Sequence, residues 1–482
     1  MLTVFVMDPD LTHELLRDHL QKSDFYNFLD VYTKHGTFRE NLISKYAPRR
    51  KTIGTTAFKL SALKSNVEIF FQESSILADK LAPFAKTHLA FEHKKFMSLA
   101  SLSMLLRATC GVDFKLQQTH HADHPFINGV EKSFELVMLR VFKPWLGVDI
   151  IFSLLGYKKE LEQACKTTRA FTEIIIDKIK TKIVQENSTV EDSIEGQPKI
   201  MEWNMFGDLI KGQPKITQDE RKTLDNASLV PLHEVLDLSK ETFVEILVRD
   251  HLTNTHQEQR ITHGELIDEV LTVVGAGYDT TKTTNSLTLI MLALHPKIQQ
   301  EVYDEIVQVL GDDPETVPTY DQIQELHLLT RVIKETLRLY PAAPIIARHI
   351  TREIQADKYT IPIGATVAAF IYQIHRDPRH WSNPHCFDPD RFLPSEISRR
   401  NPNAYLPFSS GPRNCVGSKY GMLQMKTTLS TLLRRYRVLP GDKCRSVKDV
   451  RFEFGVTLRL LAGNDIRLES REAHTSLNTS GG

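Results

Sequence analysis

The chain has 482 residues, 41% hydrophobic and 25% charged, so it can bury a large core and its length alone suggests two or three domains. Its 60 basic residues balance its 60 acidic residues, which argues against nucleic acid as a general partner, because phosphate binding depends on an excess of Lys and Arg. The cysteines are odd in number and include no Cys-x-x-Cys pair, so they indicate neither a disulfide framework nor a zinc ribbon and fit a reducing compartment best; they are Cys110, Cys165, Cys386, Cys415 and Cys444.

The first 60 residues predict a strand, a helix over residues 11–20 and a loop that leads to a basic run at residues 46–51. No stretch reaches the roughly 18 uninterrupted apolar residues that a membrane-spanning helix needs. The apolar run at the N-terminus is also too short for a signal peptide. By its residues alone, the basic run predicts a solvated cluster on a helix.

Residues 60–185 carry apolar side chains three and four positions apart, which predicts mostly helices with these side chains in the core. The stretch 186–232 is polar, contains scattered Pro and Gly, and predicts a mobile surface loop. Within it, Asn187-Ser-Thr is expected to be an unused glycosylation triplet.

A long helix is predicted next, because Thr262 and Glu265 form a capping box and Pro296 ends the pattern near His295. About 32 residues would span roughly 48 Å, enough to cross a whole domain. Its middle, residues 275–281, holds two glycines and an acid beside two threonines, and each glycine costs about 1 kcal/mol relative to alanine. Either this segment is a core helix in which Thr280 bonds back to a carbonyl one turn earlier, or its polar groups serve a function that repays the cost.

Two further segments carry charge in helical or loop contexts. Glu335 and Arg338 lie three residues apart on one helix face, a spacing that is usually a surface ion pair of little energetic value. Residues 387–392, Phe-Asp-Pro-Asp-Arg-Phe, supply another arginine, Arg391, in a loop.

The segment 408–417, Phe-Ser-Ser-Gly-Pro-Arg-Asn-Cys-Val-Gly, places Cys415 just before a helical pattern. A helix N-terminus directs its positive dipole end and unpaired N–H groups at the sulfur, so we expect it to keep a thiolate anionic. Gly411 and Gly417 allow the backbone to approach a large flat group closely. A lone cysteine is by itself more often a small buried hydrophobe, but here five residues of suitable type surround it.

This spacing, Phe-x-x-Gly-x-Arg-x-Cys-x-Gly, resembles the haem-binding loop of the cytochrome P450 superfamily. The resemblance implies haem b with Cys415 as the axial thiolate ligand of the iron. It also implies contacts to the cofactor from the rest of the loop, at Phe408, Gly411, Arg413 and Gly417. It extends over residues 1–470 and is strongest to animal microsomal members related to the fatty-acid hydroxylases.

By the same resemblance, the middle of the long helix matches the motif Ala-Gly-x-Asp/Glu-Thr-Thr. Ala276 and Gly277 would then lie against the haem, Thr280 would bond to dioxygen on the iron, and Asp279 would help to relay protons. The related hydroxylases commonly carry a glutamate where this chain has Ala276. Covalent ester attachment of haem is therefore not expected, and fatty-acid ω-hydroxylation is placed in doubt.

The resemblance also assigns structural and propionate-binding roles. Glu335, Arg338 and Arg391 would form one network for folding and haem retention. Tyr46 takes the place of a family tryptophan four residues before Arg50, which would pair with a haem propionate, as would Arg348 and His375. A solvated arginine and a satisfied core histidine remain equally good interpretations of Arg50 and His375.

The implied fold is mainly α-helical, a single domain over residues 1–472, with a smaller β-rich lobe built from the N-terminus, residues 359–372 and residues 450–470. The tail 473–482 is expected to be disordered. The implied function is monooxygenation of an apolar small molecule (a lipid, steroid or xenobiotic) with electrons from NADPH-cytochrome P450 reductase and a possible role for cytochrome b5. A haem-thiolate isomerase or dehydratase, a haem sensor and a non-enzymatic structural protein are the alternatives.

Family members of this kind act at the cytosolic face of the endoplasmic reticulum membrane and begin with a membrane anchor. Since none is present here, we expect that the chain is truncated or lacks its first exon. Residues 140–175 would still touch the membrane surface.

Overall fold

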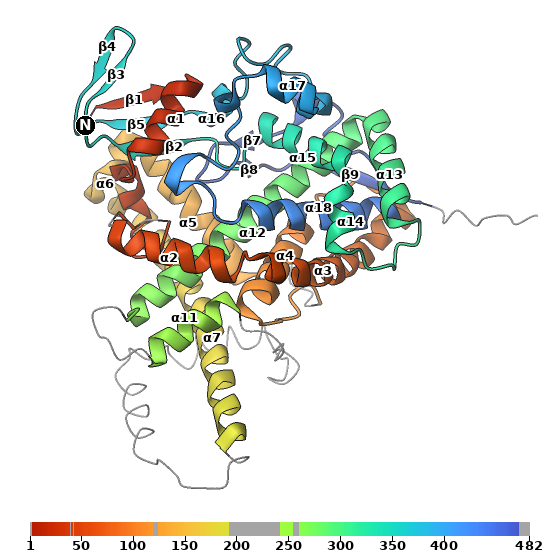
Figure 1. Cartoon of the computed structure of the whole chain (residues 1–482), viewed down its shortest axis with the longest axis horizontal. Coiled ribbons are helices and arrows are strands. Elements are labelled where there is room, and N and C mark those ends of the chain that lie inside the picture. Colours follow the sequence, from red (N-terminus) through yellow and green to blue (C-terminus); the bar gives the residue numbers. More distant parts are fainter. Residues whose placement is uncertain are drawn as a thin grey trace, which may run out of the picture.

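The computed structural model describes residues 2–38, 40–41, 43–118, 124–191, 242–253 and 260–471, and helices dominate it (Figure 1). The helices are α1 (Pro9–Asp18), α2 (Ile43–Thr56), α3 (Leu60–Thr87), α4 (Lys94–Leu105), α5 (Pro125–Phe142), α6 (Asp149–Leu154), α7 (Tyr157–Glu191), α11 (Phe243–Thr253), α12 (His263–Leu294), α13 (Pro296–Leu310), α14 (Tyr320–Glu325), α15 (His327–Leu339), α16 (Ile371–Ile374), α17 (Pro394–Arg399) and α18 (Ser418–Arg435).

The strands in the described ranges are short and pair in four small sheets. They are β1 (Thr3–Val6), β2 (Ile346–His349), β3 (Ile354–Ala356), β4 (Tyr359–Ile361), β5 (Thr366–Ala369), β6 (Tyr436–Pro440), β7 (Phe452–Glu453), β8 (Arg459–Leu460) and β9 (Ile466–Ser470). Strand β5 lies between β1, parallel to it, and β2, antiparallel to it. The C-terminal strands pair with one another and with β6, so the predicted β-rich part consists of separate sheets, and Phe452 and Phe454 pack the β7–β8 segment against Phe370 and Tyr372.

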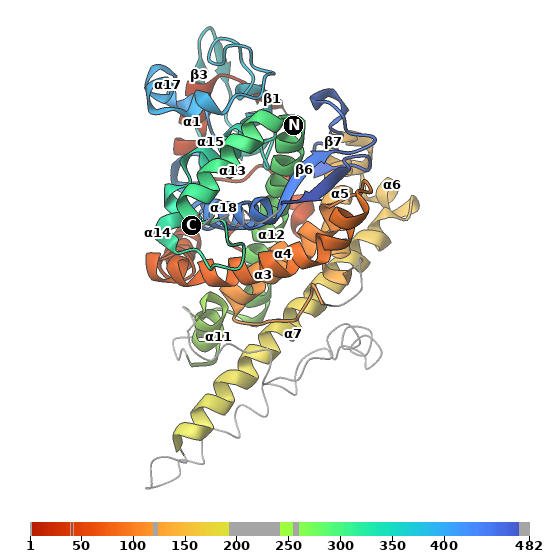
Figure 2. The same cartoon turned by 90° about the vertical axis from the view of Figure 1, so that its right-hand side faces the viewer.

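Helix α12 is the element around which the others pack. The Thr262 hydroxyl accepts from the Glu265 N–H at 3.2 Å, and the Glu265 carboxylate accepts from the Thr262 N–H at 3.0 Å. The helix runs for 32 residues and ends where Pro296 opens α13. It contacts α4, α7, α15 and α18, so it passes through the middle of the molecule (Figures 1 and 2). The predicted capping box and stop are both confirmed.

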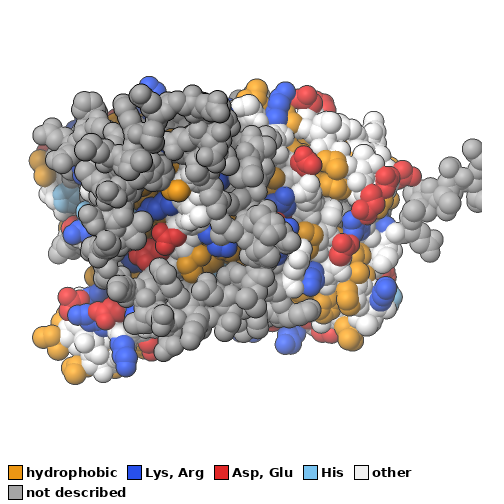
Figure 3. Space-filling view, turned by 90° about the horizontal axis from the view of Figure 1, so that it is seen from below, with side chains coloured by type: hydrophobic (Ala, Val, Ile, Leu, Met, Phe, Trp, Pro, Cys, Tyr) orange, Lys and Arg blue, Asp and Glu red, His pale blue; other side chains and the backbone are white. Residues whose placement is uncertain are grey.

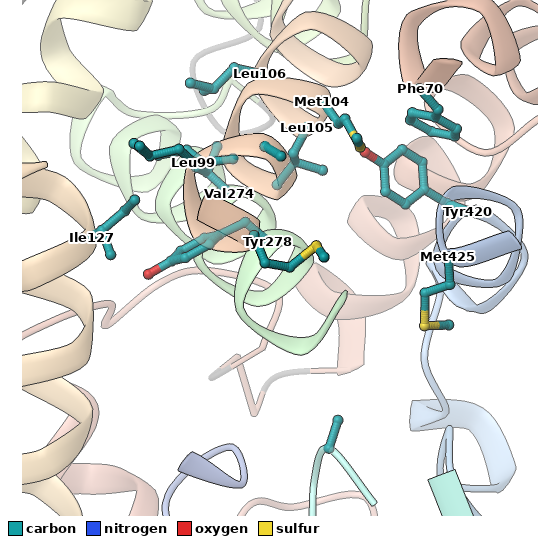
Figure 4. Close-up of a cluster of buried hydrophobic side chains, with 14 of the residues drawn as sticks. Phe70, Leu99, Met104, Leu105, Leu106, Ile127, Val274, Tyr278, Tyr420 and Met425 are labelled. Atoms are coloured by element: carbon teal, nitrogen blue, oxygen red, sulfur yellow. The ribbon is translucent and has the colours of Figure 1, made fainter. Parts of the chain in front are cut away.

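The core on one side of α12 is built from α4 and α5. Val274 and Tyr278 of α12 lie beside Leu99 and Leu105 of α4 and Ile127 of α5, and all of these side chains are buried (Figure 4). The aromatic ring of Phe126 packs near Tyr278 with the ring centres 6.1 Å apart. The side of α12 that carries Val274 and Tyr278 is therefore covered by α4 and α5.

Other predicted boundaries differ in detail. The first helix covers residues 9–18 because the Asp8 side chain caps it and Pro9 occupies its first turn. Residues 186–191 of the predicted loop continue α7, while 192–232 and the predicted tail 473–482 lie outside the described residues. Within the described residues, no helix combines the length and the apolar character needed to cross a bilayer.

The visible described part of one face of the molecule carries side chains of both charges. On the face shown in Figure 3, basic and acidic side chains of the described residues are interspersed and form no broad field of one sign.

Candidate active site

The loop that carries Cys415 is held rigidly between α1 and α18. Gly411 has a φ of +73°, and a Cβ there would lie 2.5 Å from the carbonyl oxygen of Leu16, so only glycine fits. The Cys415 N–H donates to the Phe408 carbonyl at 2.9 Å, and the Asn414 N–H donates to the Gly411 carbonyl at 3.1 Å. The backbone itself therefore fixes where the sulfur lies.

The Cys415 side chain is accessible to solvent although protein atoms surround it densely. Burial raises the pKa of its thiol, while the Gly417 N–H and the Arg50 guanidinium act to lower it, and burial outweighs them. The Gly417 N–H at the start of α18 acts in the expected direction, but in the absence of a metal it does not outweigh burial. A coordinated metal cation deprotonates a thiol directly, so the residue is suited to be a thiolate once it is a ligand.

Helix α2 delivers two side chains to this loop. The Arg50 guanidinium donates to the Asn414 carbonyl at 2.6 Å and to the Tyr46 hydroxyl at 3.3 Å, and that hydroxyl donates to the Pro412 carbonyl at 3.1 Å. The Arg413 guanidinium lies 4.1 Å from the centre of the Tyr46 ring. The basic run is therefore not only a solvated cluster, because Arg50 and Tyr46 hold the cysteine loop.

A second arginine, Arg348 of β2, is 1% exposed. Its Nη1 donates to the carbonyl of Ala347 at 3.0 Å, and its Nε has no partner. Among the described residues it forms no ion pair, and burial lowers the pKa of its guanidinium, with Tyr26 and Tyr46 acting in the opposite direction. A buried guanidinium is costly unless an anion compensates it. Tyr46 acts electrostatically on Arg348 and also contacts the cysteine loop, so the two lie in the same region. The buried Arg348 guanidinium therefore fits the anionic propionate groups of a haem held by Cys415.

One face of α12 is open at its centre. Ala276 is exposed and Gly277 and Thr280 are half-buried, although Val274 and Tyr278 beside them are fully buried. The first turn of α18 lies against this region, because a Cβ on Gly421 would be 3.8 Å from the Thr281 side chain. Helix α18 therefore brings the end of the cysteine loop next to the open face.

Thr280 makes the back-bond that a core helix predicts, since its hydroxyl donates to the Ala276 carbonyl at 2.9 Å. This bond occupies the hydroxyl proton and leaves the oxygen lone pairs as acceptors. The back-bond and a role at the open face are therefore compatible.

The two glycines of the motif have a packing reason. A Cβ on Gly277 would lie 2.7 Å from the Leu105 side chain, and a Cβ on Gly275 would lie 2.6 Å from the Tyr32 hydroxyl. The two glycines therefore give room to α4 and Tyr32, and the expected contact of Gly277 with the haem stays a prediction.

Asp279 is buried. Its carboxylate lies 2.7 Å from the Lys282 ammonium and accepts from the Thr457 hydroxyl. The same side of α12 borders a cavity of about 460 Å³ between α5, α12 and the β7–β8 hairpin. Sequence reasoning missed Lys282, although a lysine in an apolar helix was a visible signal.

The structure brings Glu335, Arg338 and Arg391 together. Arg338 donates to both Glu335 oxygens, at 2.7 and 2.8 Å, and Arg391 Nε lies 3.4 Å from Glu335 Oε1. The Asp388 N–H adds a bond to the same carboxylate at 2.9 Å. Glu335 and Arg338 are both fully buried, so this is not the usual surface pair.

His375 belongs to the same region. Its Nε2 accepts from the Leu406 N–H at 2.8 Å, and its carbonyl accepts from Arg338 at 2.9 Å. Burial, reinforced by the neighbouring Arg338 and Arg376, lowers the pKa of the ring to about 3. These contacts fit a neutral histidine in the core, but Nδ1 is buried without a hydrogen-bond partner among the described residues, so the satisfied core histidine that the sequence left open is found only in part.

Comparisons with known proteins bear on this arrangement. The family model described as cytochrome P450 matches residues 1–458. The chain is 30% identical to cytochrome P450 4g15 of Drosophila melanogaster, over 98% of this chain and 84% of that protein. It is 27% identical to cytochrome P450 4V2 of Homo sapiens, over 94% of this chain and 77% of that protein. The solved haem domain of cytochrome P450DA superposes with a TM-score of 0.69 at 19% identity, covering 98% of this chain and 87% of that one, and so shares the fold.

Proposed function

We propose, since the chain belongs to the cytochrome P450 family and is therefore a haem-thiolate monooxygenase, that its substrate is an apolar small molecule such as a lipid, steroid or xenobiotic. We further assign NADPH-cytochrome P450 reductase as its electron donor, with cytochrome b5 as an additional partner. Haem, when bound, supplies the reduction of dioxygen, the transfer of one oxygen atom to the substrate and the release of the other as water.

The residues that would hold the haem follow from the site. Cys415 would be the iron ligand, and Arg348, Arg50 and Arg413 would face the propionates. The single observation that carries this assignment is Arg348, a fully buried guanidinium that forms no ion pair with the described residues. We leave His375 out of the cofactor set because its ring nitrogen is engaged by the backbone of Leu406.

The proposed task of α12 is to supply protons at its open face. Asp279 precedes Thr280 in the chain and has a carboxylate that could pass on a proton, and the Thr280 oxygen can accept a hydrogen bond while its own proton is donated to the Ala276 carbonyl. Thr280→Ala is expected to raise the hydrogen peroxide released for each NADPH consumed. The matched control is Thr281→Ala, which removes the same kind of back-bond from a buried position. Equal peroxide yields in the two variants would show that Thr280 is structural.

An apolar substrate is supported by the wall that α5 and the hairpin give to the cavity. Phe134, Met138 and Phe142 line it from α5, and Phe454 and Leu458 line it from the hairpin. Its volume of about 460 Å³ lies in the range of small-molecule sites.

Location at the cytosolic face of the endoplasmic reticulum membrane is supported by the segment between α5 and α7. Trp145, Ile150 and Leu154 are 59%, 71% and 82% exposed there. Large exposed apolar groups in one patch are typical of membrane or partner contacts. Fractionation of the protein with these three residues changed to serine tests the assignment, which fails if membrane association is unaltered.

The experiment that tests the function itself is Cys415→Ala in the haem-loaded protein. The red-shifted Soret band of the reduced carbon monoxide complex should disappear, and NADPH consumption with purified reductase should stop. Cys386→Ala is the matched control, since Cys386 is also an exposed thiol. Retention of the band in Cys415→Ala would refute the ligand assignment, and turnover without NADPH or dioxygen would favour an isomerase or dehydratase.

A further inference from the structure

One edge of helix α2 runs along the second half of the cysteine loop. The residues on this edge are four positions apart in the chain and therefore lie one above another on the same side of the helix. They are Tyr46, Arg50 and Gly54 of α2, and Phe58 continues the series just beyond its end. In the same order they lie against the loop residues Pro412, Asn414, Val416 and Gly417. The edge of α2 thus follows the loop on both sides of the cysteine.

The contacts in the second half of this series are close and apolar. A Cβ on Gly54 would lie 3.8 Å from the Val416 side chain, and a Cβ on Gly417 would lie 3.5 Å from the Phe58 ring. The Phe58 ring in turn packs edge to face with the Tyr420 ring of α18, and the two ring centres are 5.6 Å apart. The loop is therefore fixed by α2 and its continuation where it leads into α18.

The first half of the series depends on Tyr46, which is 6% exposed. Its hydroxyl donates to the Pro412 carbonyl at 3.1 Å and accepts from the Arg50 guanidinium at 3.3 Å. Its ring centre lies 4.1 Å from the Arg413 guanidinium carbon. Arg50 also donates to the Asn414 carbonyl at 2.6 Å. One side chain therefore holds, directly or through Arg50, the three consecutive residues that precede the cysteine.

Packing alone does not explain a tyrosine at this position. Phenylalanine would keep the ring beside Arg413 and would avoid the cost of burying a hydroxyl. Here both the proton and the oxygen of the hydroxyl are engaged, one by the loop backbone and the other by Arg50. The hydroxyl of Tyr46 therefore acts on the conformation of the loop and not only on the packing around it.

We propose that Tyr46 is a positioning residue for Cys415, and that its hydroxyl holds the cysteine loop in the conformation in which the sulfur stays bound to the haem iron. The proposal rests on the proposed assignment of Cys415 as the iron ligand. Groups that surround a metal ligand fix its orientation, so a loop that loses such a group releases its ligand more often. A released Cys415 sulfur keeps the electron pair of its bond to iron and takes one proton from solvent, so its release needs no oxidant or reductant.

Tyr46→Phe in the haem-loaded protein tests the proposal, because this variant keeps the ring and loses only the two hydrogen bonds of the hydroxyl. The reduced carbon monoxide complex is warmed to a temperature at which circular dichroism shows that the helices remain intact. The measured quantity is the rate at which the red-shifted Soret band converts to an unshifted band, which reports loss of the thiolate. We expect this rate to rise about two- to tenfold, the factor that corresponds to one net hydrogen bond.

Tyr436→Phe is the matched control. Tyr436 of β6 is also 6% exposed, and its hydroxyl also donates to a backbone carbonyl, that of Ala78 in α3, at 2.9 Å. Strand β6 follows the C-terminal end of α18, whereas the cysteine loop precedes its N-terminal end. Loss of the Tyr436 bond should therefore lower the free energy of unfolding without changing the rate of band conversion.

Gly54→Ala makes the opposite change on the same edge of α2. The added methyl group would lie at an ordinary van der Waals distance from Val416, the residue that follows Cys415, and alanine is the better helix former. This variant should slow the conversion of the band. Faster conversion in Gly54→Ala would contradict the view that this edge supports the loop.

The outcomes separate this inference from the ligand assignment on which it rests. Faster conversion in Tyr46→Phe with an unchanged rate in Tyr436→Phe supports the positioning role. An unchanged rate in Tyr46→Phe, or an equal increase in both variants, would overturn the inference, while the red-shifted band of the native protein would still support a thiolate ligand. Absence of that band from the native protein would refute the ligand assignment and the inference together.

Discussion

Removal of the Glu335 carboxylate should be among the most damaging single changes in the chain. Glu335 accepts two hydrogen bonds from Arg338 and one from the Asp388 N–H, and Arg391 lies 3.4 Å away. Glu335→Ala would leave the Arg338 charge buried at 0% exposure with only carbonyl partners. Breaking one side of a buried pair costs about 3–5 kcal/mol. This is a large fraction of a total stability of about 5–15 kcal/mol.

The chain offers a matched control for this experiment. Glu396 and Arg399 of α17 have the same three-residue spacing, lie 3.3 Å apart and are 48% and 77% exposed. Glu396→Ala should therefore cost no more than about 1 kcal/mol. Haem content per polypeptide after purification and the free energy of unfolding in denaturant are the two measurements. Equal effects of the two variants on both would refute the reasoning that burial makes the Glu335 network valuable.

Three further outcomes follow from individual contacts in the structure. Gly277→Ala should destabilise the fold by about 1–3 kcal/mol, because its Cβ would overlap Leu105, whereas Gly264→Ala, which meets nothing within 4 Å, should be neutral; denaturant unfolding compares them. Arg348→Met should weaken haem binding and raise the thermal stability of the haem-free protein, because it removes a buried charge. A haem-free variant of unchanged or lower stability would contradict this. The ionised Glu131 carboxylate, which pairs with Lys282 and Lys94, stabilises the fold fully above its ordinary pKa of 4.5, and this stabilisation is lost as the pH falls toward its native pKa of about 2, because the unfolded chain binds the proton first. Glu131→Gln should therefore make the free energy of unfolding less dependent on pH across that window.

Local chemistry made much of this protein predictable from its sequence. The spacing around Cys415 encodes a turn that only glycine completes at Gly411, so the loop could be identified without knowledge of its neighbours. The ends of α12 followed from Thr262, Glu265 and Pro296, because caps and proline act on adjacent backbone groups. Both features depend on residues that lie next to one another in the chain.

What could not be predicted depends on distant partners. Lys282 meets Glu131, which precedes it by 151 positions, only because α5 packs across α12. The packing of Leu105 and Tyr32 against the glycines of α12 could not be predicted, because the sequence does not show that these side chains lie there. Strand β6 was missed because it begins directly after α18, with no turn residues to mark the change.

The close packing of Gly411 against the backbone of Leu16 has a consequence for the order of events during synthesis. The two residues are separated by 395 positions, 411 less 16, so α1 leaves the ribosome long before the loop it must support. At about 5–20 residues per second, helix α1 waits for roughly 20–80 s. Throughout that interval the segment is without its native partner and the thiol that would bind iron does not yet exist. Cofactor capture is therefore a late event of folding, and a nascent chain that stops before the loop of residues 408–417 has every earlier helix but lacks the cysteine that would bind the iron.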